Sequence, residues 1–212
     1  MKNATRITVS AFGAIAGIAG IEHGIGEILQ GPVVPGGIVI ESWPNSQLYE
    51  ILSGEPAMTI VPNLLVTGVL AIIFSLIFMI WAIGFIHKKY GGLVLILLSL
   101  ILLLVGGGFT PPILGTIIGL AATRVNSEFN EWNNYVSTRN LLAKIWPYSL
   151  IISLFRFFSL WPGLIILAAF GIQEPFIALV LVFLSFGTLF LSIFSAFAYD
   201  NKIKGKDVDS HV

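Results

Sequence analysis

The feature that most constrains this chain is a series of apolar stretches, each long enough to enter or cross a lipid bilayer. Residues 56–87, for example, contain no Asp, Glu, Lys or Arg. A helix of about 20 apolar residues crosses the ~30 Å hydrocarbon core of a bilayer. Charged residues make up only 10% of the chain, against about 25% in soluble domains. The sequence therefore predicts an all-α integral membrane protein of the cell membrane, with the lipid bilayer as its surroundings.

The apolar stretches and the segments between them predict a single membrane domain over residues 1–212, with six transmembrane helices. A Gly- and Pro-rich loop over 30–61, whose charges are all acidic, is expected to be external and to fold back over the protein. Within it, residues 46–54 predict a short helix, with Ser46 as its cap. A connection over 125–146, with apolar residues at helical spacing, is expected on the cytoplasmic membrane surface. The predicted spans cover residues 7–29, 62–87, 92–107, 111–124, 147–171 and 175–199.

The first predicted span is rich in small residues and has two interpretations. Gly13, Gly17, Gly20 and Gly24 recur every three or four residues, a spacing that lets a neighbouring helix approach closely. A basic start followed by small residues is also typical of a cleavable signal peptide. The ionisable residues near the far end of this segment argue against a simple signal peptide, so we expect it to stay in the protein.

The stretch GGGFTPP interrupts a run of apolar residues and is either a break within one membrane helix or a turn between two. A continuous helix from Gly91 to Arg124 would be about 50 Å long, well beyond the hydrocarbon thickness. Glycine suits the end of one helix, Thr110 is placed to cap the next, and prolines fit its first turn. We therefore predict an external turn formed by Gly106, Gly107, Gly108, Thr110, Pro111 and Pro112.

Basic residues decide between the two topologies, because Lys and Arg accumulate on the cytoplasmic side of membrane proteins. If the chain turns at GGGFTPP, both termini are cytoplasmic, and of the 11 Lys and Arg residues all but Arg156 lie on that side. If GGGFTPP lies within one broken helix, the chain has five spans, and the basic residues from Arg124 to the C-terminal tail move outside. We therefore predict six spans, with the turn external.

Glu22, His23 and Glu27 form a cluster of ionisable groups near the external end of the first predicted span. His23 and Glu27 lie four residues apart and share one helix face. Ionisable groups at membrane depth indicate an ion, proton or substrate site, and Asn63, at the start of the second span, is placed to reach the same region. The alternative is that these groups end the helix at the headgroups and hydrogen-bond the loop.

Arg156 lies about ten residues into its predicted span and therefore near the middle of the bilayer. A charge at that depth costs about 2.5 kcal/mol or more unless it finds a partner. Glu22 is the partner that we expect, although a long Arg side chain that reaches towards the headgroups is the alternative. Pro162 is expected to kink the same span.

Several classes of chemistry are excluded or unsupported by the sequence. The chain has no Cys, which removes disulfides, thiolate catalysis and Cys-ligated metals. It has only three His and lacks the His-Glu-x-x-His spacing, so we predict no metal and no cofactor. A net charge of zero without a basic patch predicts no binding of nucleic acid.

Three functions stay open on these observations. The first is a small transporter or permease with an external Glu/His site. The second is an accessory or structural subunit of a membrane complex, which would bind a membrane-protein partner or a second copy through faces of small residues. The third is a membrane enzyme that acts on a lipid at the outer leaflet, with the same groups as acid and base. The residues assigned to the site are Glu22, His23, Glu27, Arg156 and Asn63.

Overall fold

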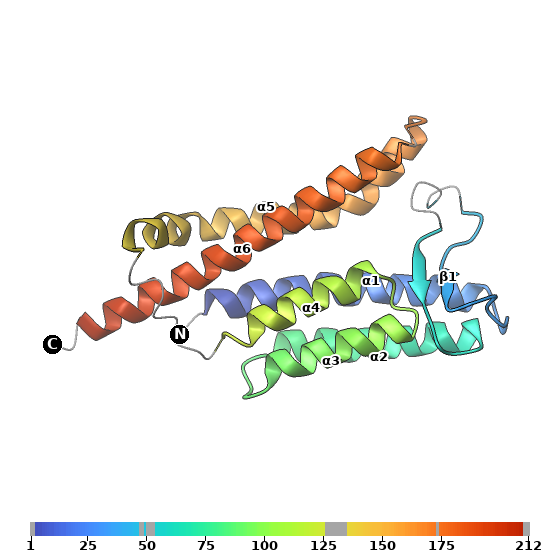
Figure 1. Ribbon diagram of the computed structural model, residues 1–212, viewed down its shortest axis with the longest axis horizontal. Coiled ribbons are helices and arrows are strands. Elements are labelled where there is room, and N and C mark those ends of the chain that lie inside the picture. Colours follow the sequence, from blue (N-terminus) through green and yellow to red (C-terminus); the bar gives the residue numbers. More distant parts are fainter. Residues whose placement is uncertain (1–2, 47–48, 50–53, 126–134, 173, 210–212) are drawn as a thin grey trace.

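The computed structural model describes residues 3–46, 49, 54–125, 135–172 and 174–209. This part of the chain forms six α-helices and one two-stranded antiparallel sheet (Figure 1). The elements are α1 (Ala4–Leu29), β1 (Val39–Glu41), β2 (Pro56–Met58), α2 (Leu64–Gly84), α3 (Gly91–Leu104), α4 (Thr110–Ala122), α5 (Val136–Ala169) and α6 (Pro175–Asp209).

Four of these helices are long and apolar enough to cross a membrane, which fits the predicted all-α membrane protein. The four segments are Ala4–Leu29, Leu64–Gly84, Val136–Leu160 and Phe176–Ile203. Helices α3 and α4 are shorter, with 14 and 13 residues. At 1.5 Å per residue they are about 21 and 20 Å long, less than the hydrocarbon thickness.

Helix α1 packs closely against α2 through the predicted stripe of glycines. A Cβ atom on Gly13 would overlap the Cβ of Ala82, and one on Gly24 would lie 2.7 Å from the carbonyl oxygen of Gly68. Gly17 and Gly20 face α2 in the same way. The contacting residue numbers rise along α1 as they fall along α2, so the two helices are antiparallel. They can approach this closely because the glycines of α1 carry no side chain at the contact.

Helices α3 and α4 form an antiparallel hairpin whose tip is GGGFTPP. The chain reverses through Gly106 and Gly108, which have φ values of +90° and +76°, a conformation that favours glycine. At the open end, a Cβ atom on Gly92 would lie 2.5 Å from the backbone nitrogen of Thr123. GGGFTPP is therefore a turn between two helices, with the prolines in the first turn of α4 as predicted. The predicted cap is wrong: Phe109 is in the cap position, and Thr110 is the first residue of α4.

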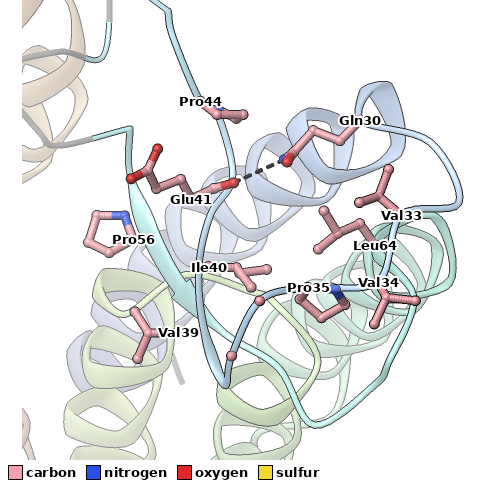
Figure 2. Close-up of a pocket in the computed structure, with 12 residues that line it drawn as sticks. Gln30, Val33, Val34, Pro35, Val39, Ile40, Glu41, Pro44, Pro56 and Leu64 are labelled. Atoms are coloured by element: carbon pink, nitrogen blue, oxygen red, sulfur yellow. Dashed lines mark hydrogen bonds between the residues drawn. The ribbon is translucent and has the colours of Figure 1, made fainter.

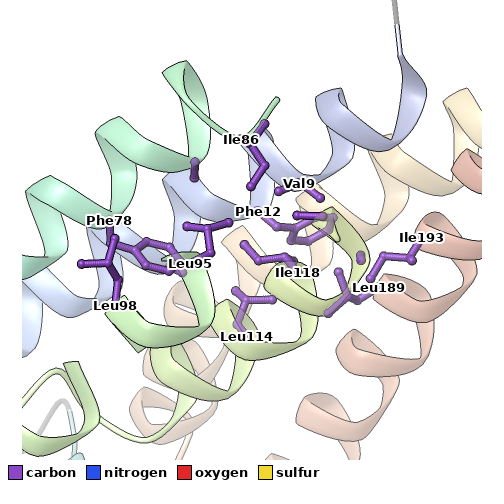
Figure 3. Close-up of a cluster of buried hydrophobic side chains, with 14 of the residues drawn as sticks. Val9, Phe12, Phe78, Ile86, Leu95, Leu98, Leu114, Ile118, Leu189 and Ile193 are labelled. Carbon is purple, nitrogen blue, oxygen red and sulfur yellow. The ribbon is translucent and has the colours of Figure 1, made fainter. Parts of the chain in front are cut away.

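The hydrophobic core lies among α1, α2, α3 and α4, and α5 and α6 close it on one side (Figure 3). Phe12 of α1 meets Phe157 of α5 edge to face, with ring centroids 5.4 Å apart, and Phe157 meets Phe186 of α6 at the same distance. The first contact joins α5 to α1, and the second joins α5 to α6. The buried residues labelled in Figure 3 are Val9, Phe12, Phe78, Ile86, Leu95, Leu98, Leu114, Ile118, Leu189 and Ile193.

Three helices, α1, α5 and α6, extend at one end by three residues or more beyond their predicted spans. Helix α5 begins at Val136, so residues 136–146 of the predicted surface connection belong to α5, whereas residues 126–134 lie outside the described residues. Helix α6 continues to Asp209 and α1 begins at Ala4. An apolar stretch marks the part of a helix that lipid can cover, and a helix can extend beyond it into water. Helix α5 also runs through Pro162 without a break, and a kink there stays a prediction.

Candidate functional site

The loop between α1 and α2 folds back over the helix ends and joins the α3–α4 turn. Strand β1 pairs with β2, with Ile40 opposite Ala57. The chain after β2 then forms a bridge from Thr59 to Val105, and the backbone N–H of Gly106 donates to the carbonyl of Met58 over 2.9 Å. In Figure 1 this assembly lies at the end of the molecule opposite the marked termini. The predicted short helix over 46–54 lies largely outside the described residues.

Under this loop, Glu22 and His23 of α1 meet Glu55, which precedes β2. The Nε2 atom of His23 lies 3.4 Å from Oε2 of Glu55. One nitrogen or carboxylate oxygen from each of the three residues lies within 4.8 Å of the others. All three residues are buried, with exposed fractions of 8%, 6% and 8% in chain order. The fold thus brings two carboxyl groups and an imidazole together away from water.

Ser42 connects this cluster to Glu27. Its hydroxyl lies 2.9 Å from Nδ1 of His23 and donates to Oε1 of Glu27 over 3.3 Å. A serine hydroxyl carries a single hydrogen, and this one is given to Glu27, so Ser42 must accept from the N–H at Nδ1 of His23. That assignment leaves Nε2 of His23 as the ring atom that faces Glu55.

Trp43 and Tyr49 cover the cluster from the loop side. Their rings stack with centroids 5.3 Å apart and planes 14° from parallel. Burial raises the pKa of Tyr49 above its ordinary value, and the neighbouring carboxyls of Glu22 and Glu55 raise it further. Tyr49 therefore remains a neutral phenol beside the two acids. On the α1 side, a Cβ atom on Gly26 would overlap the carbonyl oxygen of Ser42, so the loop lies directly on the helix.

The α3–α4 turn closes the other side of the cluster through two glycines. A Cβ atom on Gly106 would overlap the carboxyl group of Glu27, and one on Gly108 would overlap the imidazole of His23. The turn backbone is thus in direct contact with the two ionisable side chains. The end of α1 that carries Glu22, His23 and Glu27, the acidic loop and the turn were each predicted on the external side, and the structure brings these segments together.

No Lys or Arg lies beside the buried carboxyl groups among the described residues. Oε1 of Glu22 and Oε2 of Glu27 are buried and accept no hydrogen bond. Among the described residues, the basic group that we find beside these carboxyls is the imidazole of His23, whose Nε2 lies 3.4 Å from Oε2 of Glu55. Every described Lys and Arg except Arg156 lies towards the opposite end of the molecule, in a connection or in the part of a helix nearest that end. Three carboxyls therefore share one imidazole as their basic neighbour.

Arg156 and Asn63, the other two predicted site residues, do not join this cluster. Phe157, next to Arg156, packs on Phe12, and Glu22 lies ten residues farther along α1, about 15 Å away at 1.5 Å per residue. The expected pairing of Arg156 with Glu22 is therefore not formed, and Nε of Arg156 is buried without a hydrogen-bond partner. Asn63 caps α2 by accepting from the N–H of Val66 over 3.2 Å, as a helix-start residue does.

Sequence reasoning missed the parts of the site that the loop supplies. Glu55 and Ser42 lie far from Glu22 along the chain, and only the pairing of β1 with β2 brings them to α1. In the sequence, this part of the site is indicated only by a loop rich in Gly and Pro whose charged residues are all acidic. That composition does not show which Glu side chain is buried. Glu41, in the same loop, is exposed.

An open hollow of about 580 Å³ lies beside the cluster, between the loop and the start of α2 (Figure 2). Its wall includes Gln30, whose Nε2 donates to the backbone carbonyls of Glu41 and Ser42 over 2.9 and 3.0 Å. The hollow and the cluster are thus separated by the segment that carries Ser42. Glu22, His23 and Glu55 do not line this hollow.

Comparison of the chain with models of protein families, with curated protein sequences and with solved structures finds no significant match.

Proposed function

We propose that this chain is a small multi-pass membrane transporter that binds a cation in the cluster of Glu22, His23, Glu27 and Glu55. The observation that carries the proposal is the excess of buried acidic groups without a Lys or Arg beside them in the described residues. An ionised carboxyl group that is removed from water is costly unless an opposite charge pairs with it. A cation taken up from outside supplies that charge.

The distribution of charge supports an outward-facing position for this cluster. Basic residues at the opposite end, such as Lys88, Lys89 and Arg124, suit the cytoplasmic side. With that orientation, both termini are cytoplasmic and the loop over 30–61 is external. Six spans follow if α3 and α4 both cross the membrane, with their short length covered by the neighbouring helices.

The accessory-subunit hypothesis assumed that faces of small residues bind other proteins. Gly13, Gly17, Gly20 and Gly24 pack against α2 within the chain. On α6, the buried Ser195 likewise faces a helix of the same chain, because its hydroxyl lies 2.8 Å from that of the buried Ser149 of α5. These small-residue faces are therefore occupied by the protein's own helices, which favours the transporter over a subunit that binds other proteins through them.

Transport is tested in sealed proteoliposomes with dyes inside that report protons, Na⁺, Mn²⁺ or Zn²⁺. We expect the wild-type chain to admit at least one of these cations, and the Glu22→Gln variant to admit it no faster than empty liposomes. The matched control is Glu41→Gln, which removes an exposed carboxyl from the same loop and should leave the flux unchanged. Absence of flux for every cation, or an unchanged flux in Glu22→Gln, would contradict the proposal.

A further inference from the structure

We propose that Glu22, His23 and Glu55 form a site for one divalent first-row transition-metal ion of the Zn²⁺ class. This inference rests on the proposed function and deepens it, because it names the cation that the cluster takes. From the sequence we predicted no metal, and the third ligand, Glu55, comes from a distant loop.

The spacing of the three groups suits a metal ion. Bonds from zinc to imidazole nitrogen and carboxylate oxygen are about 2.1 Å long, so neighbouring ligand atoms in a tetrahedral site lie about 3.4 Å apart. Nε2 of His23 and Oε2 of Glu55 are separated by 3.4 Å. The group from Glu22 lies within 4.8 Å of both, close enough for a change of side-chain torsion to complete a three-ligand site.

The imidazole of His23 is oriented as a metal ligand should be. A ligand histidine usually gives its second ring N–H to a neighbouring oxygen, which fixes the ring and the tautomer. Here Nδ1 faces the hydroxyl of Ser42, and that hydroxyl is in turn held by Glu27. The lone pair of Nε2 is then directed at the space between the two carboxyl groups.

The unpartnered oxygen of Glu22 is the independent sign that a ligand is needed. Glu22 is 8% exposed, and its Oε1 atom accepts no hydrogen bond. Buried polar atoms in folded proteins nearly always have a partner, and exceptions call for an explanation such as an ion. Oε2 of the fully buried Glu27 is also unpartnered and lies on the other side of Ser42.

The set of ligands selects the class of ion. One imidazole and two carboxyl groups suit Zn²⁺, Mn²⁺, Fe²⁺ or Co²⁺, whereas Ca²⁺ and Mg²⁺ prefer oxygen ligands alone and Cu⁺ prefers sulfur. Three protein ligands leave a coordination position open. An open position suits an ion that enters and leaves, because a closed set of four protein ligands would hold it permanently.

Binding is measured on the full chain, purified in detergent and stripped of metal with a chelator. We expect calorimetry with Zn²⁺ to show one ion per chain, and Glu22→Gln, His23→Asn and Glu55→Gln each to weaken binding by about tenfold or more. Glu41→Gln and His87→Asn are the matched controls, with the same chemical changes at exposed positions, and should bind as the wild type does. Circular dichroism checks that each variant is helical.

X-ray absorption at the zinc edge keeps the test decisive even if a cluster variant fails to fold. Wild type and His87→Asn should both show one imidazole among oxygen ligands. Zinc with no imidazole ligand, or zinc that binds the cluster variants as tightly as the wild type, would overturn the inference. Zinc binding without cation flux in proteoliposomes would overturn transport alone, and flux without zinc binding would overturn the metal site alone.

Discussion

Gly108 shows how a single missing side chain shapes the candidate site. Its φ of +76° suits glycine, and a Cβ atom there would overlap the imidazole of His23. Gly31 has a similar φ of +80° but no atom within 4 Å of the place where a Cβ would lie. The two positions therefore separate the cost of backbone strain from the cost of displacing the histidine.

We expect Gly108→Ala to destabilise the protein more than Gly31→Ala does. Alanine at a positive φ costs about 1 kcal/mol in strain at either position, and Gly108→Ala must also move His23 or the turn. Thermal unfolding in detergent should show the larger loss for Gly108→Ala, and only this variant should weaken Zn²⁺ binding. Equal unfolding temperatures and affinities for the two variants would show that the turn does not position His23.

Some of the residues of the candidate site could be predicted from the sequence. Helical geometry alone puts His23 and Glu27 on one face, and Glu22 is next to His23 in the sequence, so these three could be grouped without a structure. The inward direction of Glu55 and the bridge through Ser42 depend on the path of an irregular loop. Glu41 and Glu55 are both loop carboxyls by sequence, and only pairing across β1 and β2 shows that one is exposed and the other buried.

At the scale of elements, Asp200 of α6 caps the start of α1. Its carboxyl accepts from the backbone N–H groups of Ala4 and Thr5 over 2.6 and 2.9 Å, and from the hydroxyl of Thr5 over 2.7 Å. The first N–H groups of a helix lack partners within the helix. A carboxylate at that end also interacts favourably with the helix dipole. Asp200 therefore fixes the end of the last helix to the beginning of the first.

We expect Asp200→Ala to lower the free energy of unfolding by about 1–3 kcal/mol, because it removes three hydrogen bonds to a charged group. Asp200→Asn should cost less, since its amide oxygen can still accept from one or two of these donors. Unfolding in detergent, followed by circular dichroism, gives the comparison. If Asp200→Ala unfolds at the wild-type temperature, the contact does not hold α1 and α6 together.

The elements themselves were largely predictable, and their ends were not. Apolar stretches located the six described helices, because helix residues that contact lipid must be apolar. The same criterion placed the start of α5 at residue 147 instead of Val136, since a helix that continues into water no longer needs an apolar sequence. The cap that Asp200 provides joins residues 196 positions apart, and no local pattern indicates it.

For the whole molecule, single cysteines introduced into this cysteine-free chain report which side of the membrane each end occupies. We expect Gly36→Cys and Glu174→Cys to react with an impermeant maleimide on intact cells, and Ser137→Cys to react only after the membrane is opened. All three positions are exposed. Gly108 is unsuitable for this test because a side chain there would overlap His23. The parent chain without cysteine is the control, and labelling of Ser137→Cys on intact cells would contradict the proposed orientation.

The contact between Asp200 and the start of α1 also sets an order of assembly. Domains and helices emerge from the ribosome in chain order, so α1 can pack against α2 while α6 has not yet been made. Until the end of α6 has been made, the N–H groups of Ala4 and Thr5 are expected to be bound to water or lipid headgroups instead of Asp200. We therefore expect closure of the helical bundle to be one of the last steps of biogenesis, and the cluster of Glu22, His23 and Glu55 at the other end of the bundle can be complete before it.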